Sequence, residues 1–90
     1  MKKIGILGGM SVVSSQLYYK IFCELTSKKL GKLHSPNIIL RSVNFEPITQ
    51  MMNRNEWGKI AKILNFEVLC LRDAGAELIV IASNTMHKIA

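Results

Sequence analysis

Three short apolar runs, separated by longer segments with helical spacing, constrain the fold most strongly. The run at residues 78–82 is apolar throughout, as is typical of a strand buried on both faces of a sheet. Residues 4–7 and 37–45 give two further strand candidates. Because strands that alternate with helices form parallel sheets with right-handed crossovers, the sequence predicts an α/β fold in the order βαβαβ. We expect three layers, the strand order 2-1-3 and one helix on each face of the sheet.

Two helices are expected between these strands. The first should begin at a serine cap, Ser11 or Ser14, and end at Gly31. The second should begin at Asn55 and end at Gly75, after a short turn of helix or loop that follows Pro47. In the first helix the apolar residues recur every four positions, and in the second they share one face. These residues are Val13, Leu17, Ile21 and Leu25, flanked by Tyr18 and Phe22, and then Trp57, Ile60, Ala61, Leu64, Val68 and Leu71.

Size and charge narrow the classes of function. Ninety residues form one domain, residues 1–90, and 12 basic against 6 acidic residues give a net charge of +6, which favours anionic partners. The basic residues are scattered rather than gathered into a stripe with aromatic residues, so we expect no nucleic-acid partner.

No run of about 20 apolar residues could span a bilayer, and the amino-terminal run is too short for a signal peptide. We therefore expect a cytoplasmic protein without a membrane partner, whose Cys23 and Cys70 are reduced and partly buried in helices.

Polar or glycine-rich segments follow two strands that should be neighbours. Residues 8–11, Gly-Gly-Met-Ser, open the first helix, where backbone N–H groups can receive an anion. Residues 83–85, Ser-Asn-Thr, follow the third strand and offer hydroxyl and amide groups for a carboxylate. A tight turn and a plain helix cap are the alternatives for the two segments. The glycine spacing does not fit a dinucleotide-binding loop, and His87 can serve as a proton shuttle, face solvent or pack in the interior.

Several segments of the chain resemble the aspartate/glutamate racemase family. They are residues 4–11 (IGILGGMS), 34–35 (HS), 42–45 (SVNF), 75–76 (GA) and 83–88 (SNTMHK). Members of the family invert the α-carbon of an acidic amino acid without pyridoxal phosphate or a metal. Two side chains, typically cysteines of two similar α/β domains, transfer protons on opposite faces of the substrate. The resemblance thus implies an isomerase of amino-acid metabolism with aspartate or glutamate as substrate, no cofactor and no metal site.

The resemblance also implies roles for individual residues. Ser83 stands where many members have the catalytic cysteine, and Met10, Asn84 and Thr85 match substrate-contacting positions. We add Ser11 as a substrate-binding residue, from the anion-site argument. The chain departs from the family at Val12-Val13, where a related branch often has tryptophan and glutamate. It also departs at Met52, where relatives have a substrate-contacting glutamine.

The resemblance covers only the amino-terminal one of the family's two domains. The second catalytic cysteine belongs to the other domain, and Cys23 and Cys70 do not replace it. We therefore expect an incomplete half of a two-domain racemase fold that is inactive as an isolated chain. The alternative is a catalytically inactive, truncated or self-associating module that binds anions. An apolar third strand at the sheet edge invites pairing, so we expect a homo-oligomer or a missing carboxyl-terminal domain.

Overall fold

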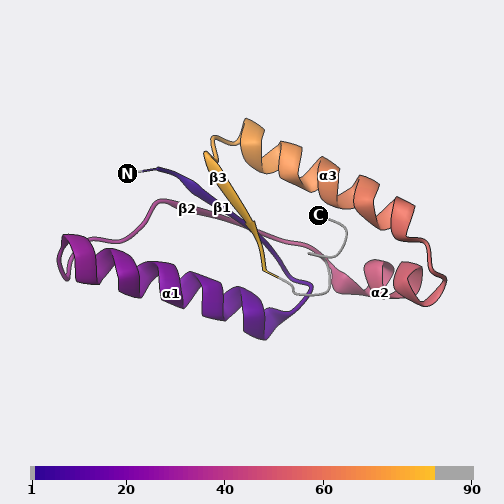
Figure 1. The fold of residues 1–90 in the computed structure, drawn as a ribbon, viewed down its shortest axis with the longest axis horizontal. Coiled ribbons are helices and arrows are strands. Elements are labelled where there is room, and N and C mark those ends of the chain that lie inside the picture. The colour runs from indigo at the N-terminus through magenta and orange to yellow at the C-terminus, as the bar shows by residue number, and fades with distance from the viewer. Residues whose placement is uncertain (1, 83–90) are drawn as a thin grey trace.

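The computed structural model describes residues 2–82, which form three strands and three helices (Figure 1). Along the chain these elements are β1 (Ile4–Gly8), α1 (Val12–Leu30), β2 (Ile38–Ser42), α2 (Phe45–Asn53), α3 (Trp57–Asp73) and β3 (Leu78–Ile81). No helix of this part of the chain is long and apolar enough to cross a membrane.

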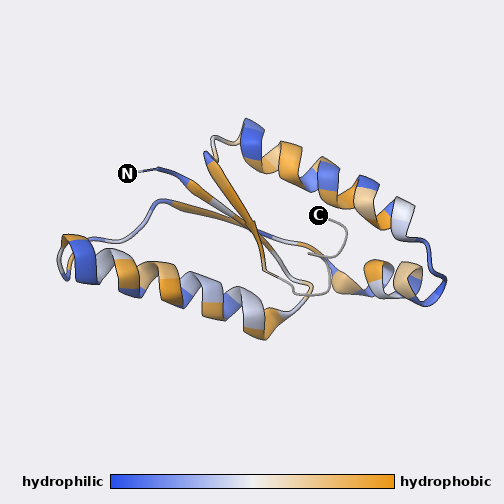
Figure 2. Ribbon diagram, viewed as in Figure 1, coloured by the Kyte–Doolittle hydropathy of each residue, from blue (hydrophilic) through white to orange (hydrophobic). Residues whose placement is uncertain are grey.

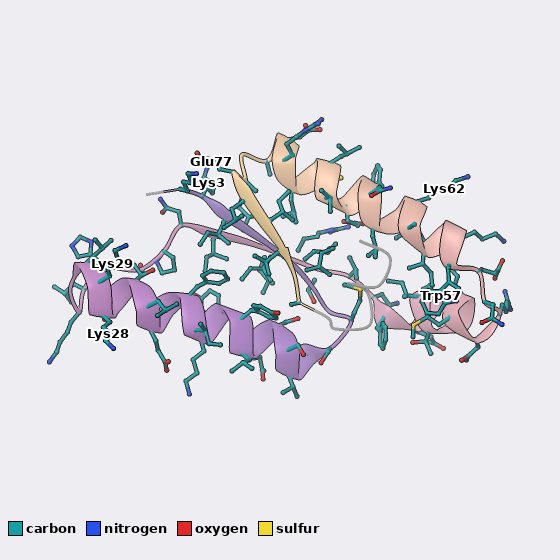
Figure 3. All side chains as sticks on the ribbon, in the orientation of Figure 1. Lys3, Lys28, Lys29, Trp57, Lys62 and Glu77 are labelled. Carbon is teal, nitrogen blue, oxygen red and sulfur yellow. The ribbon has the colours of Figure 1, made fainter. Side chains whose placement is uncertain are left out.

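The strands form one parallel sheet in the order β2-β1-β3, which confirms the predicted order. At the centre of the sheet, Ile6 is aligned with Leu40 of β2 on one side and with Val80 of β3 on the other. At the amino-terminal edge the backbone N–H of Lys3 donates to Glu77 Oε1 at 3.2 Å (Figure 3). The parallel arrangement brings the carboxyl ends of all three strands to the opposite edge.

The helices lie on both faces of the sheet, as predicted, with α1 on one face and α3 on the other (Figure 1). The main core lies between the sheet and the layer formed by α2 and α3. Alternate residues along each strand point toward this layer. Leu7 and Ile60 are fully enclosed in this core. Its buried members are Leu7, Met10, Ile48, Ile60, Leu64, Leu71 and Ala76.

Helix α1 does not bury the residues that its four-residue apolar spacing indicates. Val13, Leu17, Ile21 and Leu25 keep 75%, 53%, 41% and 58% of their surface exposed. The side that faces the sheet instead carries the buried Ser15 and the half-buried Tyr18 and Phe22. Apolar residues accordingly extend along α1 and are not confined to the side toward the sheet (Figure 2). The four-residue apolar spacing therefore does not mark the side of α1 that faces the sheet.

The second strand is shorter than predicted, and a complete helix follows it. Strand β2 ends at Ser42, whereas the prediction continued to residue 45. Asn44 instead caps α2, its Oδ1 accepting a hydrogen bond from the Glu46 N–H at 3.3 Å. Pro47 is the third residue of α2, where a missing N–H costs nothing because the first-turn N–H groups have no partner within the helix.

The cap of α3 lies one residue later than predicted. Asn55 has a positive φ of 57° and lies in the turn, and Glu56 occupies the cap position. The predicted buried face of α3 is confirmed: Ile60, Leu64 and Leu71 are buried, and Trp57 packs against the core at the start of the helix (Figure 3). Of the two free cysteines, Cys23 is half-buried, as predicted, but Cys70 is exposed.

Candidate functional site

Three loops meet at the carboxyl edge of the sheet. Residues 9–11 follow β1, Val43 and Asn44 follow β2, and Ala82 follows β3. Backbone hydrogen bonds hold these loops together: the Val43 N–H donates to the Gly8 carbonyl and the Ala82 N–H to the Leu7 carbonyl, both at 2.9 Å. Ligands of open α/β sheets bind at this edge, so the fold places the glycine-rich segment where the sequence predicted a site.

Ser15 lies underneath the first of these loops and fixes its shape. Its hydroxyl oxygen accepts a hydrogen bond from the Gly9 N–H at 3.0 Å, and its hydroxyl donates to the Ser11 carbonyl at 3.0 Å. A Cβ at Gly8 would collide with the Ser15 hydroxyl oxygen, so only glycine allows this approach. Gly9 has a φ of +90° and lies against the backbone of Val43. The loop is therefore held on two sides, by α1 and by the segment after β2.

The two predicted site residues of this loop have different surroundings. Ser11 caps α1, its side chain accepting a hydrogen bond from the Ser14 N–H at 3.3 Å. The side chain of Met10 belongs to the core, and the residue is only 3% exposed. The N–H groups of Met10 and Ser11 make no hydrogen bond to any other residue within 2–82. At the amino end of a 19-residue helix, such N–H groups favour a negatively charged ligand.

The other predicted site residues, Ser83, Asn84, Thr85 and also His87, lie outside the described residues. Ala82, which precedes them in the chain, is fully buried and bonded to Leu7 at the site edge. Among residues 2–82, no three histidine, cysteine, aspartate or glutamate side chains gather closely enough to hold a metal ion.

An ion pair beneath the carboxyl edge joins β2 to α3. Arg41 Nε and Nη2 donate to the two carboxylate oxygens of Glu67 at 2.6 and 3.2 Å. The Glu67 side chain is nearly buried, whereas that of Arg41 is about half exposed. The hydrogen bond to Glu67 and its negative charge raise the pKa of Arg41. Because both charges are used within this pair, Arg41 is not a free cation for an acidic ligand.

The comparison with solved structures shows what this fold belongs to. A protein from Yersinia pestis described as a candidate Asp/Glu racemase matches with a TM-score of 0.95 and 43% identity, over 99% of this chain and 39% of its own. The chain belongs to the aspartate/glutamate racemase family. An aspartate racemase homologue from Pyrococcus horikoshii matches with a TM-score of 0.88 and 42% identity, over 99% of this chain and 38% of its own. No profile of a known protein family matches the sequence.

This racemase-family chain thus spans less than two fifths of either matching protein. The sequence placed the glycine-rich loop at the correct edge of the sheet but missed Ser15 and the Arg41–Glu67 pair. Ser15 carries a weak signal, since it follows the cap Ser11 by one helical turn. The pairing of Arg41 with Glu67, which are 26 positions apart, leaves no signal in the sequence.

Proposed function

We propose that this chain carries one half of a racemase site for an acidic amino acid, aspartate or glutamate. The carboxyl edge of the sheet supplies the loop 8–11 for a substrate carboxylate, and the side chains of residues 83–85 supply hydroxyl and amide groups for the same ligand. Substrate-binding roles fall to Met10, Ser11, Asn84 and Thr85. Since the side chain of Met10 is enclosed and that of Ser11 caps α1, both contribute through their backbone N–H groups.

The proposal rests on the backbone hydrogen bonding at the amino terminus of α1. Two adjacent N–H groups lack a partner within residues 2–82, and the loop that presents them is fixed by Ser15 and by the Val43 backbone. A prearranged pair of donors at a helix amino terminus binds a carboxylate without first having to order the loop. The names of the two matching proteins agree with an acidic amino acid as the ligand.

In the reaction that we propose, Ser83 is the proton-transferring group on one face of the α-carbon. A hydroxyl is a much weaker base than a thiolate, so Ser83 requires activation by a neighbouring group. The group on the opposite face is then a cysteine from the part of a racemase that this chain does not match. Neither pyridoxal phosphate nor a metal takes part, and the protein acts in the cytoplasm, with no nucleic-acid or membrane partner.

Exchange of the substrate α-proton for deuterium tests this proposal. We expect the chain alone to bind L-aspartate or L-glutamate without exchange, because proton transfer needs groups on both faces of one carbon. Addition of a purified carboxyl-terminal racemase domain should start exchange, Ser83→Ala should abolish it, and Ser83→Cys should accelerate it. Equal exchange with the chain and with Ser83→Ala under these conditions would contradict the role of Ser83.

The second candidate is a module that binds anions but does not catalyse, and that self-associates. It is favoured by the exposed apolar surface of α1 described above. Binding of acidic amino acids without exchange in any combination of domains would favour this candidate over the racemase half-site.

A further inference from the structure

Asn44 brings a second set of hydrogen-bond donors to the carboxyl edge of the sheet. The Val43 N–H donates to the Gly8 carbonyl at 2.9 Å, and the backbone of Val43 lies against Gly9. Asn44 is the next residue along the chain, and it is exposed. Asn44 therefore adjoins the loop that we assign to substrate binding.

A helix cap fixes which end of the Asn44 amide is available to a ligand. The Oδ1 atom accepts a hydrogen bond from the Glu46 N–H at 3.3 Å, at the start of α2. The Nδ2 group makes no hydrogen bond to another residue within the described part of the chain. Rotation of the amide by half a turn would withdraw the oxygen from the Glu46 N–H and weaken the start of the helix. Asn44 thus presents its N–H donors, rather than its oxygen, to a ligand.

The charges at this edge leave the second carboxylate of an acidic amino acid to neutral donors. Arg41 is already paired with Glu67. Within residues 9–11 and 43–46 the one charged side chain is that of Glu46, which is exposed and lies in the first turn of α2, where the helix dipole offsets its charge. No lysine or arginine of these two segments can therefore receive a second anion.

A fixed N–H donor also separates an acid from its amide. A hydroxyl group can either donate or accept, so it bonds a carboxylate and a carboxamide equally well. An N–H donor that cannot turn accepts no hydrogen bond from a ligand NH2 group, and the two donors then oppose one another unpaired. The capped amide of Asn44 is such a donor.

We propose that Asn44 is a specificity-determining residue of the half-site, and that its side-chain amide donates to the second carboxylate of an acidic amino acid. The first carboxylate lies at the backbone N–H groups of the α1 amino terminus. The inference rests on the proposed function, since it requires a ligand at the loop 9–11. It adds the reason why the site takes aspartate or glutamate rather than asparagine or glutamine.

Asn44→Asp is the variant that tests this role. It keeps an oxygen for the Glu46 N–H and replaces the N–H donors by a second carboxylate oxygen. Amide NMR titrations of the 90-residue chain give the dissociation constants of L-aspartate and L-asparagine. We expect binding of L-aspartate to weaken by about tenfold or more, because two carboxylates would meet. The preference should reverse toward L-asparagine, whose NH2 group can donate to the new carboxylate.

Two further variants separate the donor from the cap and from the added charge. Asn44→Ser keeps a cap oxygen but loses the amide donors, so it should weaken L-aspartate binding without reversing the preference. Asn53→Asp makes the same change of charge at an exposed position at the opposite end of α2, and should leave the preference unchanged. Urea unfolding should show that Asn44→Asp is no less stable than the parent chain, since aspartate caps a helix as well as asparagine does.

The outcomes distinguish this inference from the proposed function. An unchanged preference in Asn44→Asp, or an equal shift in Asn53→Asp, would overturn the role of Asn44 and leave the half-site intact. Failure of the parent chain to bind L-aspartate would instead contradict the proposed function, and this inference with it.

Discussion

The Ser15 hydroxyl oxygen accepts a hydrogen bond from the Gly9 N–H at 3.0 Å, which ties the first turn of α1 to the loop after β1. The same hydroxyl donates to the Ser11 carbonyl, so one buried side chain joins both ends of the loop. This relationship holds in place the loop that carries the N–H groups that we assign to substrate binding. The geometry of the site therefore depends on a residue that need not itself contact the ligand.

Removal of this hydroxyl should destabilise the protein. In Ser15→Ala the Gly9 N–H loses its acceptor in a part-buried place, which we expect to cost about 1–2 kcal/mol in the free energy of unfolding. Ser14→Ala is the matched control, since its side chain makes no hydrogen bond to another residue within 2–82, and should change stability by less than about 0.5 kcal/mol. Urea unfolding of both variants measures the difference. Equal stability of the two variants would mean that the Ser15 bonds contribute nothing.

A methyl group at Gly9 should be among the most damaging small changes in the chain. Its Cβ would meet the Val43 carbonyl oxygen and lie 2.6 Å from the Val43 nitrogen, and the φ of +90° is strained for alanine. We expect Gly9→Ala to cost more than about 2 kcal/mol. Gly58→Ala is the control, because nothing lies within 4 Å of its Cβ, and should stabilise α3 by about 0.5 kcal/mol. A shift of the two melting temperatures in the same direction would contradict this account.

The Arg41–Glu67 pair should respond unequally to loss of its two members. Arg41→Met leaves the nearly buried Glu67 carboxylate without its guanidinium, which we expect to destabilise the fold. Glu67→Met removes the buried charge and leaves Arg41 free to turn into solvent, so its cost should be smaller. Chemical denaturation measures both values. A larger loss for Glu67→Met would show that the carboxylate is better solvated than the structure indicates.

Acidification should weaken the start of α3 through Glu56. Lys59 Nζ lies 2.5 Å from Glu56 Oε2, and this hydrogen bond lowers the pKa of Glu56 below its ordinary value of 4.5. A group whose folded-state pKa is lowered stabilises the fold above the unfolded-state pKa and loses that contribution as pH falls through the folded-state pKa. Glu56→Gln should therefore be less stable than the parent chain at neutral pH, and this difference should shrink in acid. A difference in stability that is independent of pH would show that the charge of the Glu56 carboxylate is not its cause.

The apolar runs were sufficient to predict the three strands, but β3 is only half-buried, with Leu78 half exposed, and is not enclosed on both faces as its apolar run indicated. On α1 the four-residue apolar spacing does not mark the side toward the sheet. Val13, Leu17, Ile21 and Leu25 are all exposed, and Ser15, Tyr18 and Phe22 face the sheet instead.

Helix α2 and Ser15 were missed for other physical reasons. Pro47 was taken to precede a turn or short helix, but proline fits the first turn of a helix, and the Asn44 cap shows that the helix starts before it. Ser15 has no hydrophobic signal, and its role depends on contact with Gly8 and Gly9 in space. The sequence correctly placed the glycine-rich loop between β1 and α1. The roles of the candidate site residues Met10, Ser11, Ser83, Asn84 and Thr85 stay predictions.

Titration of the isotopically labelled chain with L-aspartate and L-glutamate, followed by amide NMR, tests the central claim most directly. We predict saturable shifts of the Gly9, Met10 and Ser11 amides, which lie at the α1 amino terminus, and weaker shifts with the neutral analogues L-asparagine and L-glutamine. Ser15→Ala should reduce these shifts, whereas Ser14→Ala should preserve them. Shifts that do not saturate, or that are equal for acidic and neutral amino acids, would contradict a half-site for an acidic amino acid.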